Sequence, residues 1–300
     1  MARLLLSIAT VCALLLAMRL SAAPPGSDAL ATQPAAPRVL VFSKTAGFRH
    51  QSIPDGIACI KELARDGDKV LFEVDATEDA AQFNDEILAR YGAVVFLSTT
   101  GDILDAEQQA AFERFVKKGR GYVGVHAASD TEYEWPWYAS LVGAYFKGHP
   151  ANQDAVVVVE DHTHPSTKSL PDRWKRYDEW YSFRSNPRQA VHVLASLDET
   201  SYKPGELAMG DHPVAWWHLY DGGRAWYTAL GHTQESYAEP AFREHLKGGI
   251  LWALGLAKVV APSPSPSTPE APAAAPAAPA VKPSADPSKS NPLSHPAPEG

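Results

Sequence analysis

The chain has 300 residues, of which 45% are hydrophobic and 21% are charged; these values are ordinary for a globular protein and exclude disorder of the whole chain. Its formal net charge of −8 at pH 7 leaves no basic surface, so we expect no binding to nucleic acid. Of its 25 Pro residues, 12 lie in the last 40 positions, which therefore cannot belong to a folded core.

The N-terminus has the layout of an export signal. Arg3 precedes an apolar run that leads to the small residues Ala22 and Ala23, which is typical of a secretory signal peptide over residues 1–23. We therefore expect a secreted or periplasmic protein with no membrane insertion after signal removal. A lipoprotein anchored through Cys12 is the less favoured alternative.

The rest of the chain divides by composition into three parts. Residues 24–37 are predicted to be a linker, and residues 38–257 to form one domain. Residues 258–300 are rich in Pro and Ala and are predicted to be a disordered tail. Such a tail is long enough to connect the domain to an envelope partner.

The first half of the domain alternates short apolar strands with helices. This alternation predicts an α/β fold with a mainly parallel sheet flanked by helices. The predicted strands are 39–43, 70–74, 93–97 and 122–125, and the predicted helices are 53–63 and 105–118.

The second half of the domain is rich in strands, with few helices between them. Asp221, Gly222 and Gly223 predict a tight hairpin turn, and a closing helix is expected over residues 240–254. The predicted strands are 155–160, 173–183, 191–197, 214–220 and 224–230.

Three polar loops follow strands of the predicted parallel sheet, at residues 44–50, 98–102 and 126–132. Ligands bind at the carboxyl ends of such strands, so these loops are candidates for a binding site. Helix capping accounts for their Ser, Thr and Asp residues but not for Arg49 or His50. The candidate substrate-binding residues of these loops are Lys44, Arg49, His50 and Thr100.

The turn at residues 124–128, Gly-Val-His-Ala-Ala, has the spacing of a nucleophile elbow with His126 at its centre. An acyl-transfer enzyme would carry Ser or Cys there, and Cys59 lies on the apolar side of a predicted helix, where a buried thiol is expected. A hydrolase with a Ser or Cys nucleophile is therefore disfavoured. His126 and the nearby Asp130 are instead candidate acid/base residues.

Several histidines occupy turns, where a side chain is lifted out of the packed layers. We expect His50, His126, His149, His212 and His232 to converge on one pocket as acid/base groups or ligands. No cofactor is identified by a motif, although a divalent metal is possible. Its candidate ligands are His50, His149, His212 and Asp211, and Asp130 or Glu179 could serve as further oxygen ligands.

Aromatic residues are dense after His126, and their faces suit stacking on a sugar ring. Trp135 is a candidate platform, as are Trp137 and Trp180. Within the predicted strand 173–183, Glu179 is expected to share a face with Tyr177 and Tyr181. Such surroundings predict a raised pKa for Glu179 and a role as general acid or base.

Seven motifs in one order give the chain a resemblance to the ThuA-like (trehalose utilisation) family over residues 38–256. These motifs are KTAGFRH (44–50), TTGD (99–102), GVHAASDTEY (124–133), GAYFKGHP (143–150), DEWY (178–181), GDHP (210–213) and GHT (231–233). The resemblance implies a flavodoxin-like fold of the class I glutamine amidotransferase-like type. It also implies sugar catabolism, plausibly of 3-keto-glycosides, and absent glutaminase activity, because His126 stands where amidotransferases carry Cys.

Together these features predict an exported enzyme that acts on 3-keto-glycosides or related sugars by isomerase or lyase chemistry. The alternative is a non-catalytic carbohydrate-binding module, which would need the aromatics but not the acid/base cluster. The candidate catalytic residues are His126, Glu179, Asp130 and His232; the candidate substrate-binding residues are Lys44, Arg49, His50, Thr100, Trp135, His149 and His212.

Overall fold

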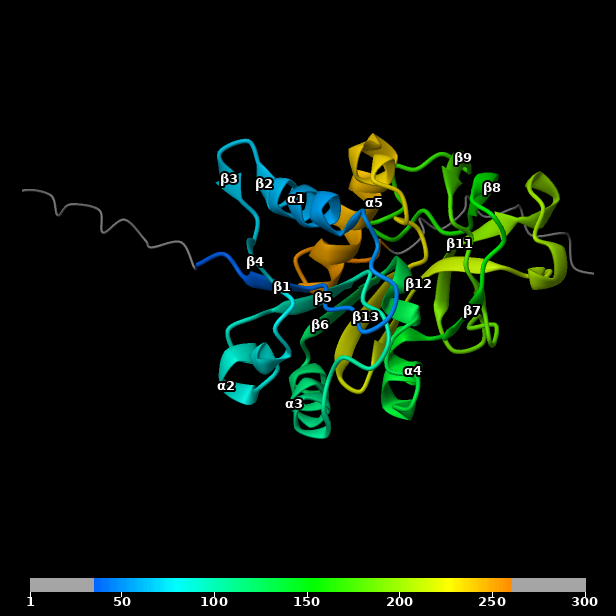
Figure 1. Ribbon diagram of the computed structural model, residues 1–300. Helices are drawn as coiled ribbons and strands as arrows, with labels where there is room; N and C mark the ends of the chain where they lie inside the picture. The colour runs from blue at the N-terminus through cyan, green and yellow to red at the C-terminus, as the bar shows by residue number, and fades with distance from the viewer. Residues whose placement is uncertain (1–34, 261–300) are drawn as a thin grey trace, which may run out of the picture. The chain divides into compact units, whose positions relative to one another are not determined.

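The computed structural model describes residues 35–260 (Figure 1). The predicted signal peptide, most of the predicted linker and the tail from residue 261 lie outside the described residues. Within residues 35–260, no helix is both long and apolar enough to cross a membrane.

A nine-stranded mixed sheet runs through the described part of the chain, with strand order β4-β1-β5-β6-β13-β12-β11-β8-β9. The pairs from β4 to β13 are parallel, and the pairs from β13 to β9 are antiparallel. In chain order these strands are β1 (Arg38–Phe42), β4 (Glu73–Thr77), β5 (Ala93–Leu97), β6 (Gly121–Val125), β8 (Gln153–Val159), β9 (Arg173–Asp178), β11 (His192–Asp198), β12 (Pro213–Tyr220) and β13 (Gly223–Thr228).

The parallel half of this sheet confirms the predicted fold class. Numbered along the chain, its five strands have the order 2-1-3-4-5, which is that of flavodoxin-like folds. β5 and β6 are buried at every position, as expected for strands that are covered on both faces. The antiparallel half extends the sheet beyond β13, and it corresponds to the predicted strand-rich second half of the domain.

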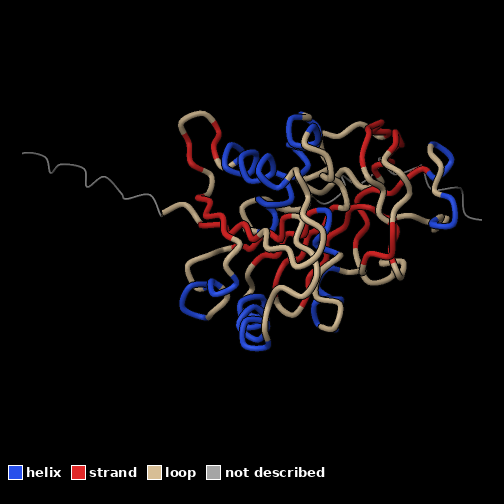
Figure 2. The backbone as a smooth tube through the Cα atoms, in the orientation of Figure 1, coloured by secondary structure: helices blue, strands red, loops and turns tan. Residues whose placement is uncertain are grey.

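Helices cover both faces of the sheet (Figures 1 and 2). α1 (Ile53–Leu63) and α5 (Pro240–Ala253) lie on one face, and α2 (Asp85–Leu88), α3 (Ala106–Lys117) and α4 (Pro136–Val142) lie on the other. α5 approaches the sheet closely: a Cβ at Gly121 would lie 2.5 Å from the carbonyl oxygen of Ala253. Only glycine fits this position of β6.

The remaining elements are short. Two small two-stranded sheets pair β2 with β3 and β7 with β10. Their bounds are β2 (Arg65–Asp66), β3 (Lys69–Val70), β7 (Phe146–Gly148) and β10 (Ser182–Phe183). The 3-10 helices are η1 (Ala80–Gln82), η2 (His126–Ser129), η3 (Glu199–Ser201), η4 (Gly205–Leu207) and η5 (Glu235–Ala238).

Two predicted strands differ from the structure. The strand expected at 70–74 is divided between β3 and β4, because a turn at Gly67, with φ of +58°, folds β2 back on β3. The strand expected at 173–183 ends at Asp178, where the chain leaves β9 and later pairs with β7 through β10. Glu179 therefore lies just beyond the end of β9 and does not share a strand face with Tyr177, which is exposed.

Candidate functional site

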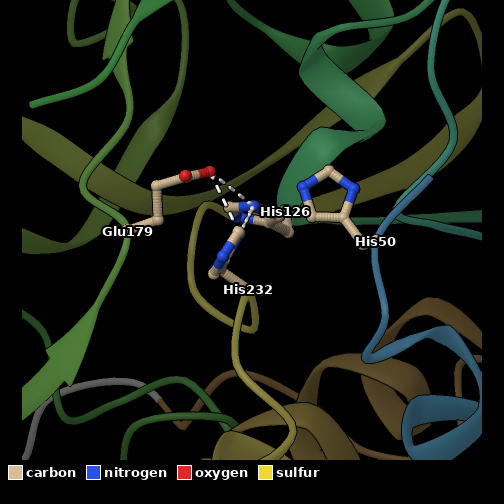
Figure 3. Close-up of side chains that lie close together, drawn as sticks. All are labelled: His50, His126, Glu179 and His232. Atoms are coloured by element: carbon tan, nitrogen blue, oxygen red, sulfur yellow. Dashed lines mark hydrogen bonds and ion pairs between the residues drawn. The ribbon is translucent and has the colours of Figure 1, made fainter. Parts of the chain in front are cut away.

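Four side chains meet near the carboxyl ends of the parallel strands: His50, His126, Glu179 and His232 (Figure 3). His50 lies between β1 and α1, His126 directly follows β6, and His232 follows β13. Glu179 follows β9, the edge strand of the antiparallel half. One potential ligand atom from each residue lies within 4.8 Å of the other three. We call these four residues the His/Glu cluster.

Three atoms of the His/Glu cluster form a tight triangle. His126 Nε2 lies 3.3 Å from Glu179 Oε2 and 3.3 Å from His232 Nδ1. His232 Nδ1 lies 3.1 Å from the same Glu179 oxygen. Two imidazole nitrogens and one carboxylate oxygen therefore point at a common centre.

The backbone fixes the direction of the His126 ring. His126 has a φ of +51°, in the left-handed region that is unusual for a residue other than glycine, and it forms the predicted turn between β6 and η2. Its Nδ1 lies 2.8 Å from the carbonyl oxygen of Ala229. A carbonyl can only accept, so Nδ1 carries a proton and Nε2 faces the cluster.

Asp178 joins the two segments that carry Glu179 and His232. Its fully buried carboxylate accepts hydrogen bonds from the backbone N–H groups of Glu179, Gly231 and His232, at 3.0, 2.9 and 3.1 Å. Arg176, itself buried, donates to the same carboxylate at 2.9 Å. The strand from the antiparallel half is thereby tied to the loop that follows β13.

His50 packs against the other two histidines. Its ring centroid lies 4.7 Å from that of His126 and 5.2 Å from that of His232, and only 3% of the residue is exposed. Burial, followed by the nearby imidazoles of His126 and His232, lowers the pKa of His50 to about 2. The ring is therefore neutral at physiological pH. Its Nδ1 is buried and has no hydrogen-bond partner among the described residues.

The pKa of Glu179 shifts opposite to the direction predicted from its aromatic neighbours. Burial alone would raise it, but hydrogen bonds and charge interactions with His126 and His232 outweigh burial and hold the pKa well below its usual value. Glu179 is therefore an ionised anchor of the cluster, and it does not carry the proton that a general acid needs.

A pocket of about 290 Å³ opens beside the His/Glu cluster. Its volume is near the lower end of the range for ligand pockets, about 300–1,000 Å³. Phe48 stands at its edge with 65% of the residue exposed. The pocket is lined by the aromatic residues Phe48, Phe146 and Tyr181 and by the polar residues His50, Asp130, His149 and Glu179.

Asp130 is the second carboxylate that lines this pocket. Burial raises its pKa, and the hydrogen bond from the Tyr133 hydroxyl and the charges of His126, Arg184 and His149 offset this effect only in part. The Tyr133 oxygen lies 2.5 Å from Asp130 Oδ1. His149 is half-exposed, and its Nδ1 lies 3.2 Å from Glu179 Oε1.

A second cavity, of about 440 Å³, adjoins the cluster on the side of His232 and shares Phe48 with the first. Arg49 lines this cavity, while its guanidinium pairs with Glu78 at 2.7 Å in a half-exposed ion pair. Of the predicted substrate-binding residues, His50 and His149 line the first pocket and Arg49 lines the second.

The structure places the other predicted binding residues in supporting positions. Lys44 donates to the carbonyl of Ile103, and the Thr100 hydroxyl donates to the carbonyl of Phe48, so both brace the loops at the sheet edge. Trp135 is 7% exposed and donates to Glu113 as part of the core.

His212 and Asp211 do not take part in the cluster. The ring nitrogens of His212 are occupied by Glu199 and by the carbonyl of Tyr181, each at 2.8 Å. Asp211 pairs with Arg188 at 2.6 Å. Among the predicted metal ligands, His50 and Glu179 belong to the group of described residues that could hold an ion, whereas His149, His212, Asp130 and Asp211 do not.

Three site residues were not recognised in the sequence: Phe48, Phe146 and Asp178. Phe48 lies inside the KTAGFRH loop and Asp178 directly precedes Glu179, so motif position could have indicated both. Cys59 is not a nucleophile of this site, because it is buried in α1 and burial raises the pKa of its thiol to about 11.

Comparisons with known proteins concern the fold and the family. The family model ThuA, described as trehalose utilisation, matches residues 38–253. A ThuA-like protein from Bacteroides uniformis is similar in structure, with a TM-score of 0.62 and 26% identity over 75% of this chain and 94% of that chain. A ThuA-like protein from Parabacteroides merdae has a TM-score of 0.60 and 19% identity over 73% and 90% of the two chains, a likeness of fold alone. No curated protein matches the chain.

Proposed function

The chain belongs to the ThuA (trehalose utilisation) family, and on this premise we propose that it is an exported enzyme acting on 3-keto-glycosides or related oxidised sugars. The proposed reaction is of the isomerase or lyase type, and no glutaminase activity is expected from a turn that carries His126. The observation that carries the proposal is the pocket in which Asp130 and His149 accompany the His/Glu cluster.

The walls of the pocket support a sugar as the substrate. Phe48, Phe146 and Tyr181 provide aromatic faces, and sugar rings present C–H groups that pack on such faces. The ring centroids of Phe146 and Tyr181 lie 4.1 Å apart, so these two side chains form one continuous wall. Asp130, His149 and Glu179 offer polar atoms for hydroxyl groups.

The acid/base groups suit proton transfer next to a carbonyl. In a 3-keto-glycoside, the Asp130 carboxylate accepts the proton from C2, and the electrons of that bond form an enolate at C2 and C3. The enolate oxygen then needs an N–H donor or a cation beside it. Elimination then forms a C1–C2 double bond as the C1–O bond to the aglycone breaks, and the departing oxygen takes a proton from His149.

Export and a role for the tail are part of the same proposal. They rest on the composition of residues 1–23 and 258–300, which fall largely outside the described residues. Fractionation of cells that express the full chain tests export directly: an N-terminally processed protein outside the cytoplasm supports it, and an unprocessed cytoplasmic protein contradicts it.

Turnover of a defined panel tests the reaction. The panel contains 3-keto-glycosides and their parent disaccharides, and NMR follows the loss of substrate and the appearance of an enone or a shifted keto group. Asp130→Asn is expected to lower kcat/KM by about 10²–10⁴-fold, the usual contribution of a positioned base. Asp172→Asn, at a side chain that is 92% exposed, is the matched control and should leave turnover unchanged.

Three outcomes would contradict the proposal or a part of it. An unchanged panel, with and without added divalent cations, would show that the enzyme assignment is wrong. Binding of the sugars without turnover would favour the non-catalytic carbohydrate-binding module. Equal activity of Asp130→Asn and the wild type would remove Asp130 from the mechanism.

A further inference from the structure

We propose that His50, His126, Glu179 and His232 bind one divalent first-row transition-metal ion. The inference deepens the proposed function, on which the catalytic role of the ion rests, whereas binding itself is independent of any substrate. Four separate features of the site support it: the spacing of the donor atoms, their lone pairs, the unpaired His50 and the position of the pocket.

The spacing of the donor atoms fits a metal better than a set of hydrogen bonds. In a tetrahedral zinc site with bonds of about 2.0–2.1 Å, neighbouring donor atoms are about 3.3 Å apart. The three distances among His126 Nε2, His232 Nδ1 and Glu179 Oε2 are 3.3, 3.1 and 3.3 Å. The three atoms thus form one face of such a tetrahedron.

The lone pairs of the cluster lead to the same conclusion. Because the Nδ1 proton of His126 is used on the carbonyl of Ala229, the 3.3 Å contact between its Nε2 and the Glu179 carboxylate requires either a second ring proton or a cation between the two atoms. A second proton would make the His126 ring a cation, whereas a proton on His232 Nδ1 leaves that ring neutral. A metal ion would bind His126 Nε2, His232 Nδ1 and the Glu179 oxygen at once, because each ligand must present a lone pair.

The surroundings of His126 and His232 have the form of a second coordination shell. Histidine ligands usually donate their other ring N–H to a carbonyl or carboxylate, which fixes the ring direction, and His126 does so to Ala229. Asp178 fixes the backbone of both Glu179 and His232. The site is therefore braced before any ion arrives.

His50 supplies the independent observation. The residue is 97% buried, lies beside the cluster in Figure 3, and its Nδ1 has no hydrogen-bond partner among the described residues. An unpaired buried ring nitrogen is costly to the fold, and an ion bound by either ring nitrogen would give the imidazole a polar partner.

The donor set selects the class of ion. Three imidazoles and one carboxylate suit Zn²⁺, Fe²⁺, Co²⁺, Ni²⁺ or Mn²⁺, whereas Mg²⁺ and Ca²⁺ prefer sites made of oxygen atoms. His50 and Glu179 also line the 290 Å³ pocket, so an open coordination position would face the substrate. There the ion would polarise a carbonyl and stabilise an enolate oxygen.

Metal binding can be measured on the purified full chain without a substrate. The protein is treated with a chelator, checked for an unchanged circular dichroism spectrum, and titrated with Zn²⁺, Mn²⁺ and Mg²⁺ by calorimetry. We expect one Zn²⁺ or Mn²⁺ per chain and no comparable binding of Mg²⁺. Co²⁺ should give the visible absorption of an ion held by nitrogen and oxygen ligands.

Variants identify the ligands. His126→Gln and Glu179→Gln are each expected to weaken binding more than about 100-fold, beyond the loss typical of second-shell changes. His162→Gln, at an exposed histidine outside the cluster, is the matched control and should bind as the wild type does. If the variants do not fold, the Co²⁺ spectrum and stoichiometry of the wild type decide the question.

Absence of stoichiometric binding would overturn the proposal, as would cluster variants that bind as tightly as the control. The two proposals fail separately: a chain that binds one ion but converts no sugar contradicts the proposed function alone. A metal-free chain that turns over at the full rate contradicts only the catalytic role of the ion, and a chain that turns over but binds no ion contradicts the metal site alone.

Discussion

Replacement of Asp178 by Asn tests how the site is held together. The substitution keeps the size of the side chain but exchanges one acceptor oxygen for an NH₂ donor. That donor would face Arg176 Nη2 and the N–H of Gly231, which both donate to Asp178 Oδ2. The variant therefore loses two hydrogen bonds and brings donors into contact in a fully buried place.

The expected loss of stability is large because the ion pair is buried. The side chains of Arg176 and Asp178 are 3% and 0% exposed, and removal of one partner from such a pair costs about 3–5 kcal/mol. Glu239, which lies 3.4 Å from Arg176 Nη1, is partly exposed and compensates only weakly. A loss of this size is a substantial part of a typical unfolding free energy of about 5–15 kcal/mol.

Urea unfolding at pH 7, followed by the fluorescence of the eight Trp residues, measures this loss. Glu73→Gln is the matched control, because it breaks the Arg38–Glu73 pair at 2.7 Å, whose side chains are 41% and 54% exposed. Exposed pairs of this kind contribute about 1 kcal/mol or less. The Asp178→Asn variant should also bind Zn²⁺ about 10–100-fold more weakly, since the Glu179 and His232 segments are no longer joined.

The reasoning is refuted if Asp178→Asn and Glu73→Gln lose the same free energy of unfolding. A stable Asp178→Asn variant with unchanged metal affinity would show that the loop after β13 holds His232 without help from β9.

Three further predictions concern the rest of the chain. Gly249→Ala should lower the free energy of unfolding in urea by about 1–3 kcal/mol or more, because the new Cβ would lie 2.5 Å from the Trp226 ring; a variant as stable as the wild type contradicts this contact. Burial lowers the pKa of His245 from 6.5 to about 4, so the unfolded chain takes up the proton first and stability should fall by ~3 kcal/mol as pH drops from 6.5 to 4. Urea unfolding at both pH values should show that His245→Gln loses less stability between these pH values than the wild type does. An equal loss would show that another group causes the acid sensitivity. Deletion of residues 261–300 should leave metal affinity and turnover unchanged, since the candidate site lies within residues 35–260, and a marked loss of either would show that the tail takes part.

Local sequence patterns predicted the parallel half of the fold well. Strands such as β5 are apolar throughout and are bounded by turns and helix caps, so the signal lies within a few neighbouring residues. The Asp105 cap of α3 is of the same kind, because its side chain accepts from the backbone of Gln108 three residues away. Such features depend on short-range geometry, which the sequence contains directly.

The sequence also indicated which histidines are candidates for the site, but it could not show which groups their rings contact. His50, His126 and His232 follow three strands that end at one edge of the parallel sheet, so their meeting follows from the α/β pattern. Nothing local distinguishes His212, at a similar turn, from these three. Its ring is occupied by Glu199 and the Tyr181 carbonyl, contacts that depend on how distant segments pack.

Only the tertiary structure decided the role of Glu179. The sequence placed it in a strand among aromatics and predicted a raised pKa, whereas β9 ends one residue earlier and the carboxylate meets two imidazoles. The sign of a pKa shift depends on the charged groups that surround the carboxyl, and here they come from loops more than 50 residues away in the sequence. The sequence by itself determined the family, the parallel sheet and the histidine-bearing loops, because these depend on local patterns. The antiparallel half of the sheet places Glu179 beside the histidine-bearing loops. Such long-range packing is determined only in the folded chain.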